Sequence, residues 1–251
     1  MTSVAHQLQQ TLTRLEEART RAGRPPGAVA LLAVSKTFPA EAVREAHAAG
    51  QCAFGENYVQ EALDKIAALA DLRAQLQWHL IGPLQSNKTR PVAAAFDWIH
   101  TVDRLKIAQR LAEQRPDGLP PLQLCLQVNI SGEDSKSGVA PQDVAALACA
   151  VAALPADRVR LRGLMSIPEP VEGLAAQREP HRRLHELLAV VNAALAPGGQ
   201  RLDTLSMGMS ADLEAAVLEG ATWVRAGTAV FGGRARLPVV GASVAGAATG
   251  A

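Results

Sequence analysis

Lys36 is the residue whose setting most clearly suggests a chemical role. It follows the β-branched apolar run Val29–Val34, and no other lysine follows such a strand-like run. Those other lysines fall in helical patterns or polar loops: Lys65, Lys106, Lys88 and Lys136. Partial desolvation at a strand end disfavours the charged ammonium, so a free amine becomes available at neutral pH. Because a neutral amine forms a Schiff base with an aldehyde, we expect this chemistry unless Lys36 is an ordinary solvated charge.

Two segments have the composition of a phosphate-binding site. They are Leu205–Ser210 and Arg225–Thr228, at the ends of the seventh and eighth expected strands. Their glycines let backbone N–H groups approach a phosphate, and a helix expected from Ala211 adds the positive end of its dipole. Either segment alone is ordinary turn chemistry. Together with Lys36, the two segments predict a pocket for a phosphorylated aldehyde.

Arg225 lies inside the eighth expected strand, between Val224 and Ala226. A buried guanidinium needs a partner because it cannot lose its charge. The residues leave two partners open: an acceptor nitrogen on a bound heterocycle, or a strand-end acid such as Glu56.

The remaining polar clusters give weaker signals. His181 and His185 are spaced i, i+4, but two arginines lie between them and no acid completes a zinc-protease pattern. We interpret this segment as a solvated helix face. Gly132–Gly138 is a polar loop without the GK[ST] ending of a phosphate-binding P-loop. No metal site is predicted.

Strand-like runs alternate with longer stretches of helical period along the chain. The expected strands are Val29–Lys36, Cys52–Asn57, Gln77–Gly82, Trp98–Asp103, Leu122–Ile130, Leu161–Ile167, Thr204–Gly208 and Thr222–Val230. The expected helices between them are Pro39–Ala49, Tyr58–Leu69, Arg104–Gln114, Pro141–Ala153, Arg178–Leu195 and Ala211–Glu219. This alternation predicts parallel strands with crossover helices, and a single closed (β/α)8 TIM-like barrel of the α/β class. An open doubly wound sheet is the alternative, although no GxGxxG turn follows the first strand.

Two terminal segments lie outside this alternation. Val4–Arg21 carries an apolar stripe and predicts an extra N-terminal helix that completes the outer ring. From Leu237 to Ala251 the chain is uncharged and rich in glycine and alanine. We therefore expect a barrel domain of residues 1–234 and a disordered tail at residues 235–251.

Composition narrows the class of protein. A formal net charge of +1 gives no sign of a polyanionic partner, so we expect no nucleic-acid binding. The three cysteines have no CxxC spacing and lie in apolar segments, as expected in a reducing compartment. We find no signal peptide and no run of about 20 apolar residues, so we expect a cytoplasmic protein without a membrane span.

Long motifs carry a resemblance to a known family. They are AVSKTFP (Ala33–Pro39), FGENYVQE (Phe54–Glu61), WHLIGPLQSNK (Trp78–Lys88), VNISGEDSKSGV (Val128–Val139), RGLMSIP (Arg162–Pro168), LSMGMSADLEAA (Leu205–Ala216) and VRAGTAVFGGR (Val224–Arg234). The chain resembles the pyridoxal-phosphate homeostasis proteins, single-domain relatives of the N-terminal barrel of alanine racemase. The resemblance runs from about Gln7 to Arg234.

The resemblance implies a fold-type III barrel with pyridoxal 5′-phosphate (PLP) as cofactor. In this family pattern Lys36 matches the lysine that forms the internal aldimine. Ser206, Gly227 and Thr228 match the phosphate-binding positions, with Ser210 as a further contributor.

Three more positions match the pocket. Arg225 matches the residue that faces the pyridine nitrogen, where it keeps that nitrogen unprotonated and weakens the cofactor as an electron sink. Asn57 and His79 match positions that line the pocket.

The resemblance also implies a function. Alanine racemase has a second, β-rich domain that supplies a tyrosine base, whereas this sequence ends just after the barrel and its only tyrosine is Tyr58. We therefore expect a PLP-binding protein that buffers and delivers the cofactor in vitamin B6 and amino-acid homeostasis, without significant catalysis. Apo PLP-dependent enzymes are the expected partners, and the protein is expected to be a monomer or weak homodimer. The alternative is a PLP-dependent amino-acid racemase of low activity.

Overall fold

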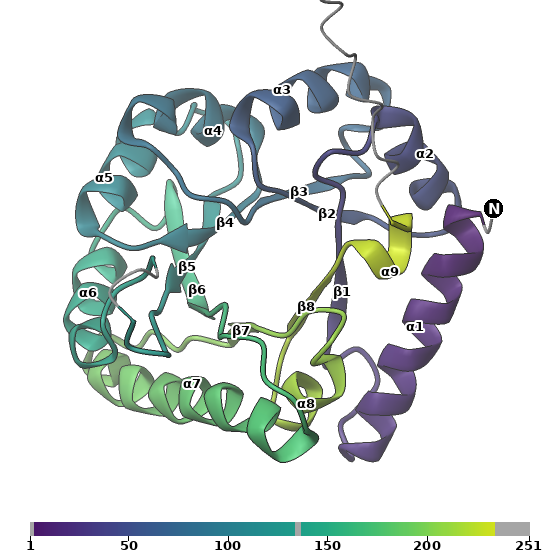
Figure 1. The fold of residues 1–251 in the computed structure, drawn as a ribbon. Coiled ribbons are helices and arrows are strands. Elements are labelled where there is room, and N and C mark those ends of the chain that lie inside the picture. Colours follow the sequence, from purple (N-terminus) through teal and green to yellow (C-terminus); the bar gives the residue numbers. More distant parts are fainter. Residues whose placement is uncertain (1–2, 134–136, 234–251) are drawn as a thin grey trace, which may run out of the picture.

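The barrel is the central feature of the fold. The computed structural model describes residues 3–133 and 137–233. Eight parallel strands pair in chain order, and β8 pairs with β1 to close the ring (Figure 1). The predicted closed (β/α)8 barrel is confirmed, and the open doubly wound sheet is wrong. Residues 235–251, the expected tail, lie outside the described residues.

Each expected strand is present, although most are shorter than predicted. The strands are β1 (Ala30–Val34), β2 (Ala53–Glu56), β3 (Gln77–Leu80), β4 (Trp98–Val102), β5 (Leu122–Gln127), β6 (Val159–Met165), β7 (Thr204–Ser206) and β8 (Trp223–Ala226). The eighth was expected to reach Val230, but it ends at Ala226 because Thr228–Phe231 turns into the short helix α9.

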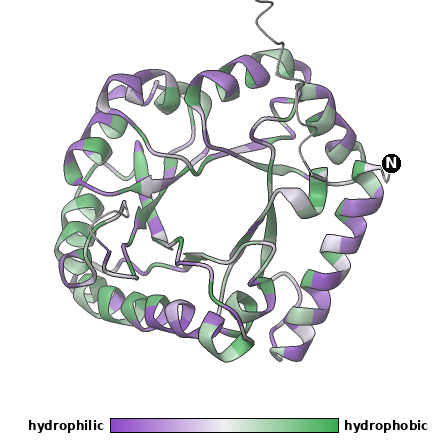
Figure 2. Cartoon of the chain, in the orientation of Figure 1, coloured by the Kyte–Doolittle hydropathy of each residue, from purple (hydrophilic) through white to green (hydrophobic). Residues whose placement is uncertain are grey.

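The helices form the outer ring, and their amphipathic character is visible as alternating colours in Figure 2. They are α1 (Val4–Arg21), α2 (Ala40–Ala48), α3 (Val59–Ala68), α4 (Thr89–Ala95), α5 (Leu105–Gln114), α6 (Val144–Ala152), α7 (Leu174–Leu195), α8 (Leu213–Leu218) and α9 (Thr228–Phe231). Short 3-10 turns lie at Ala70–Leu72, Ser86–Lys88, Pro141–Asp143 and Ala196–Gly198. The sequence prediction missed α4, and it began α7 too late because Pro180 lies inside the helix rather than at its start.

The extra N-terminal helix is confirmed, and its neighbours matter for the site. Helix α1 packs against α2, α8 and α9, so it lies beside the last two helices of the chain (Figure 1). Its buried residues Leu8, Leu15 and Ala18 form the stripe that faces them. None of the helices in the described ranges is both long and apolar enough to cross a membrane.

Strand alternation divides the core into two parts. In β1, Leu31 and Ala33 belong to the large core shared with the helices, whereas Leu32 and Val34 belong to a small cluster inside the barrel. The same alternation directs Arg225 of β8 inward, since its neighbours Val224 and Ala226 belong to the outer core. The barrel interior therefore holds polar side chains beside small apolar clusters.

Candidate functional site

The predicted site residues gather at one end of the barrel. Because all strands are parallel, the segments that follow them meet at the same mouth. Lys36 lies just beyond β1, Asn57 follows β2, Ser206 ends β7, and Gly227 follows β8. Strands β7, β8, β1 and β2 are neighbours in this order, so both expected phosphate-binding segments lie on the β8 side of Lys36.

The turn that carries Lys36 has an unusual backbone. Lys36 is half-buried. Thr37, which follows it, has a φ of 67° and is the only non-glycine residue with a positive φ among the described residues. The Thr37 N–H donates to Glu61 Oε1 at 2.5 Å. Before the lysine, the Ser35 hydroxyl donates to Glu56 Oε1 at 2.6 Å. Both flanks of Lys36 are therefore held by carboxylates.

Lys65 is buried more deeply than Lys36, which the sequence analysis missed. Its side chain is 4% exposed, and its Nζ lies 2.5 Å from Glu56 Oε1 and 2.8 Å from the Ser35 carbonyl oxygen. Burial raises the pKa of the Glu56 carboxyl, although Lys65 and Ser35 oppose this shift. Since Glu56 is paired with Lys65, the expected alternative of an Arg225–Glu56 salt bridge is wrong.

Arg225 is bound to neutral groups inside the barrel. It is 4% exposed, its Nη1 donates to Ser206 Oγ at 2.9 Å, and its Nη2 donates to the Ser166 carbonyl oxygen at 2.8 Å. Burial lowers its pKa to about 10, so it remains a cation at neutral pH. No carboxylate in the described ranges forms an ion pair with it. The two bonds leave other guanidinium N–H groups for a ligand.

A chain of hydrogen bonds runs from Arg225 through the barrel. Ser206 Oγ is 2.8 Å from His100 Nδ1, His100 Nε2 is 2.9 Å from His79 Nδ1, and His79 Nε2 is 2.9 Å from Gln77 Oε1. Burial lowers the pKa of His100 to about 3 and that of His79 well below its ordinary value, so both are neutral.

With both rings neutral, only one donor-to-acceptor direction is consistent along this chain of hydrogen bonds. Arg225 Nη1 donates a hydrogen bond to Ser206 Oγ, so the serine hydroxyl donates in turn to His100 Nδ1. Each histidine then carries its proton on Nε2, and Gln77 accepts the last bond. All four ring nitrogens are engaged. His79, which was expected to line the pocket, is fully buried in the barrel interior.

The two serines of Leu205–Ser210 differ in whether their hydroxyl groups are free to bind a ligand. The hydroxyl of Ser206 is engaged by Arg225 and His100, whereas that of half-exposed Ser210 has no partner within the described residues. Strand alternation explains the difference, because Ser206 still belongs to β7 and points inward. Of the two, Ser210 is the one that offers a free hydroxyl at the mouth.

The segment around Ser210 is held from two sides. From α1, Arg14 Nη1 donates to the Ser210 carbonyl oxygen at 2.7 Å, and the same guanidinium forms a bidentate pair with Glu214. From within the segment, Asp212 Oδ1 accepts the Met209 N–H at 2.7 Å. The N-terminal helix therefore fastens the expected phosphate-binding segment to the ring.

The interpretation of His181 as part of a solvated helix face is wrong. His181 is fully buried, and its Nε2 lies 2.9 Å from Asp212 Oδ2. Burial alone would raise the pKa of Asp212, but the bonds from His181 and Met209 lower it overall. Leu184 and Val191 are also buried, and their spacing of three and ten residues from His181 was the available signal for an inward face.

Glycines just after β3 and β8 allow close backbone approach at the mouth. A Cβ on Gly227 would lie 3.2 Å from the Val34 carbonyl oxygen, so this position brings the last loop tightly against β1. A Cβ on Gly82 would lie 2.0 Å from the Asn57 carbonyl oxygen. The loop after β3 is therefore packed on the backbone of Asn57.

Three buried polar atoms at this end of the barrel have no hydrogen-bond partner within the described residues. One is Glu56 Oε2, whose carboxylate is paired with Lys65 through its other oxygen. The other two are Asn57 Oδ1 and Ser166 Oγ, in residues that directly follow β2 and β6. A buried polar atom is costly unless it is hydrogen-bonded, so these atoms indicate a place for a polar ligand. With the amine of Lys36 and the free donors of Arg225, these groups fit a phosphorylated heteroaromatic aldehyde such as PLP.

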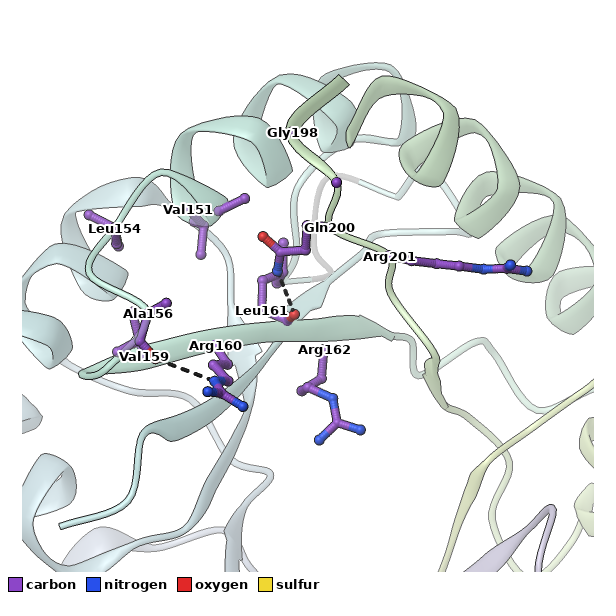
Figure 3. A pocket seen from close by; sticks show the side chains of 12 residues that line it. Val151, Leu154, Ala156, Val159, Arg160, Leu161, Arg162, Gly198, Gln200 and Arg201 are labelled. Carbon is purple, nitrogen blue, oxygen red and sulfur yellow. Dashed lines mark hydrogen bonds between the residues drawn. The ribbon is translucent and has the colours of Figure 1, made fainter. Parts of the chain in front are cut away.

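A separate pocket of about 390 Å³ lies at the other end of the barrel. It is formed by the first half of β6 and the segment before β7, and it contains none of the candidate residues. Figure 3 shows Gln200 directed at the Leu161 carbonyl oxygen, whereas Arg160 and Arg162 leave the strand on the opposite side. Arg162 is occupied by Asp203. The arginines do not converge on a ligand site.

Comparisons of sequence and structure with known proteins all match the chain to the same family of barrel proteins. The family described as alanine racemase, N-terminal domain, matches residues 7–235. The pyridoxal phosphate homeostasis protein of Pseudomonas aeruginosa is 63% identical over 234 residues, which cover 93% of this chain and 97% of that protein. The protein of the same name from Escherichia coli strain K12 is 53% identical, with coverage of 93% and 98%. The structure of PipY from Synechococcus elongatus PCC7942 with PLP bound is 40% identical, with a TM-score of 0.77 and coverage of 92% and 100%.

Proposed function

This chain belongs to the pyridoxal phosphate homeostasis proteins, on the barrel of the alanine racemase N-terminal domain, and we propose that it binds, buffers and delivers PLP. PipY, a structural relative, has been solved with PLP bound. The proposal places the cofactor at the barrel mouth beside Lys36. It assigns the protein a role in vitamin B6 and amino-acid homeostasis rather than in catalysis.

One observation supports the proposal most strongly. Arg225 is a buried cation with spare donors and no carboxylate partner among the described residues, and it lies next to β1 in register with Leu32. Lys36 follows the same strand further toward the mouth. An amine above and a donor-only cation below suit a ligand with an aldehyde at one position and an acceptor nitrogen in its ring.

The serine, glycine, threonine and asparagine residues of the site have proposed parts in binding. Ser210, together with the backbone amides of Gly227 and Thr228, offers donors to a phosphate. Ser206 acts through Arg225 by fixing the guanidinium, and Asn57 offers its unpaired oxygen to the ligand. When bound, PLP supplies an aldehyde and an electron-withdrawing ring. Arg225 donates a hydrogen bond without releasing its proton, so the ring nitrogen stays unprotonated.

The same residues favour a carrier over an enzyme. Racemisation through two bases needs a second acid–base group opposite the lysine. His79 and His100 are unsuited to this role because each ring nitrogen is engaged and burial keeps both rings neutral. We therefore propose that bound amino acids are turned over negligibly.

The proposal also covers the domain, the partners and the cellular compartment of the protein. Residues 1–234 act as one binding domain, and apo PLP-dependent enzymes receive the cofactor from a monomer or weak homodimer. The three cysteines are free, which suits a reducing compartment such as the cytoplasm. No nucleic acid or membrane takes part in this role.

The test of the cofactor site uses PLP and borohydride. Wild-type protein incubated with PLP is expected to become yellow and, after reduction, to carry one stable adduct on Lys36. The variant Lys36→Ala is expected to lose both signals, whereas Lys106→Ala, an exposed lysine of α5, keeps them. An adduct mapped to Lys65 instead would contradict the assignment.

The carrier role needs two further measurements. Loaded protein is expected to restore activity to an apo PLP-dependent enzyme. L-alanine incubated with loaded protein in deuterated water is expected to keep its chirality. Racemisation on the order of 1 s⁻¹ or faster would favour the racemase alternative.

A further inference from the structure

The turn after β1 is held in a conformation that its sequence does not favour. Thr37 has φ 67°, in the left-handed region, which a β-branched residue rarely adopts. Such residues persist only where surrounding contacts hold them, and they concentrate at functional sites. Here the unusual residue directly follows Lys36.

The contacts that hold this turn come from one cluster. We define the α3 cluster as Glu61 and Lys65 of α3 together with Glu56, the last residue of β2. Glu61 Oε1 accepts the Thr37 N–H at 2.5 Å and lies 3.2 Å from Lys65 Nζ. Lys65 Nζ also donates to the Ser35 carbonyl oxygen at 2.8 Å. The residues before and after Lys36 are thus bonded to the same cluster.

The cluster is well buried where it meets the turn. The side chains of Lys65 and Glu56 are 4% and 0% exposed, and that of Glu61 is 31% exposed. Burying two opposite charges is weak evidence for stability, because desolvation offsets much of their attraction. A role in fixing a specific geometry explains the cluster better than added stability does.

The far side of the turn is also fixed. The Phe38 N–H donates to the Ser35 carbonyl oxygen at 3.1 Å, which closes the turn around Lys36. The Phe38 ring stacks on Phe231 of α9 with centroids 5.0 Å apart. The turn that carries Lys36 is therefore held on one side by the charged residues of the α3 cluster and on the other by the stacking of Phe38 on Phe231 of α9.

We propose that the α3 cluster is a positioning device that directs the Lys36 amine into the barrel mouth by holding Thr37 in the left-handed conformation. This inference rests on the proposed PLP site. In this step the amine nitrogen bonds to the aldehyde carbon, and the aldehyde oxygen leaves as water as the C=N bond forms. The step needs the amine within a narrow range of distance and angle, so a shift of the turn slows it. The proposed phosphate and ring contacts come from the ends of β7 and β8, so we expect a change at Glu61 to leave them unaffected.

Two ligands separate positioning from folding. PLP has the aldehyde that reacts with Lys36, whereas pyridoxine 5′-phosphate carries an alcohol in its place and binds only noncovalently. Glu61→Ala is expected to slow covalent capture of PLP at least tenfold in stopped-flow absorbance. Its affinity for pyridoxine 5′-phosphate is expected to stay within twofold of wild type. Glu113→Ala, an exposed acid of α5, is the control and leaves both values unchanged.

A rescue variant tests the backbone argument directly. Glycine adopts positive φ without steric cost, so Thr37→Gly combined with Glu61→Ala is expected to return the capture rate to within threefold of wild type. Glu61→Gln keeps an acceptor for the Thr37 N–H and is expected to lie between wild type and Glu61→Ala.

Three results would overturn the inference. They are a wild-type capture rate in Glu61→Ala, a parallel loss of pyridoxine 5′-phosphate affinity, and no rescue by the glycine. If the wild-type protein bound neither ligand, the proposed function itself would fail, and that outcome is distinct from the other three.

Discussion

We expect the neutral histidine pair inside the barrel to make the folded protein less stable in acid. Each histidine of the unfolded chain takes up a proton near pH 6.5, whereas folded His100 does so only near pH 3 and folded His79 well below 6.5. Acid therefore stabilises the unfolded chain, and stability is lost as pH falls below 6.5. The slope is about 1.4 kcal/mol per pH unit for each group, so His100 alone contributes a loss of about 2 kcal/mol by pH 5.

The assay compares free energies of unfolding from urea titrations at pH 7.5 and pH 5.0. His100→Gln is expected to lose about 2 kcal/mol less than wild type between these pH values. His6→Gln, at an exposed position of α1, is expected to keep the wild-type difference. Destabilisation of His100→Gln at both pH values does not affect the comparison, because the readout is the difference. An unchanged difference in His100→Gln would refute the neutral, one-directional chain, as would NMR evidence for a proton on Nδ1 of either ring.

Three more outcomes follow from contacts described above. Arg14→Gln removes a hydrogen bond to the segment after β7 and is expected to weaken PLP binding roughly three- to tenfold in fluorescence titrations. The affinity for pyridoxal, which has no phosphate, is expected to stay unchanged. The control Arg44→Gln loses a comparable bidentate pair with an exposed aspartate and is expected to leave PLP binding unchanged. Gly82→Ala places a Cβ 2.0 Å from a backbone oxygen and is expected to cost more than about 2 kcal/mol of stability in urea titrations, while Gly198→Ala, with open space around it, costs less than about 1. Burial raises the pKa of the Cys125 thiol to about 12, so the native protein is expected to react with a thiol reagent only at its two exposed cysteines, and a third fast thiol would contradict this.

The architecture was predictable because barrel strands are buried on both faces. Such strands read as short apolar runs, and the alternation with helices specified their parallel order. The eighth strand was extended too far because Thr228–Phe231 is short, apolar and rich in β-forming residues. Four residues are too few to reveal a helical period.

The site was less predictable where it depends on contacts between elements. Helical period placed Lys65 on α3 but gave no indication that Glu56, at the end of β2, would pair with it. In the same way, Ser206 and Ser210 both suit a phosphate by composition. Their different contacts depend on which residue is the last of β7, and strand ends are poorly defined by sequence. Burial of His181 followed a helical stripe, but the neighbouring arginines obscured it.

The charge of Arg225, to which no carboxylate of the described residues is bonded, has a consequence for how a ligand reaches the barrel. Its partners are a serine hydroxyl and a backbone carbonyl, so the mouth holds a permanent positive charge in surroundings that screen it weakly. Such a field draws anions from solution and raises their rate of encounter. A phosphorylated ligand should therefore associate more slowly as salt is added, while its dissociation changes little. In the proposed site, the buried cation that contacts the bound ligand would thus also set how fast that ligand arrives.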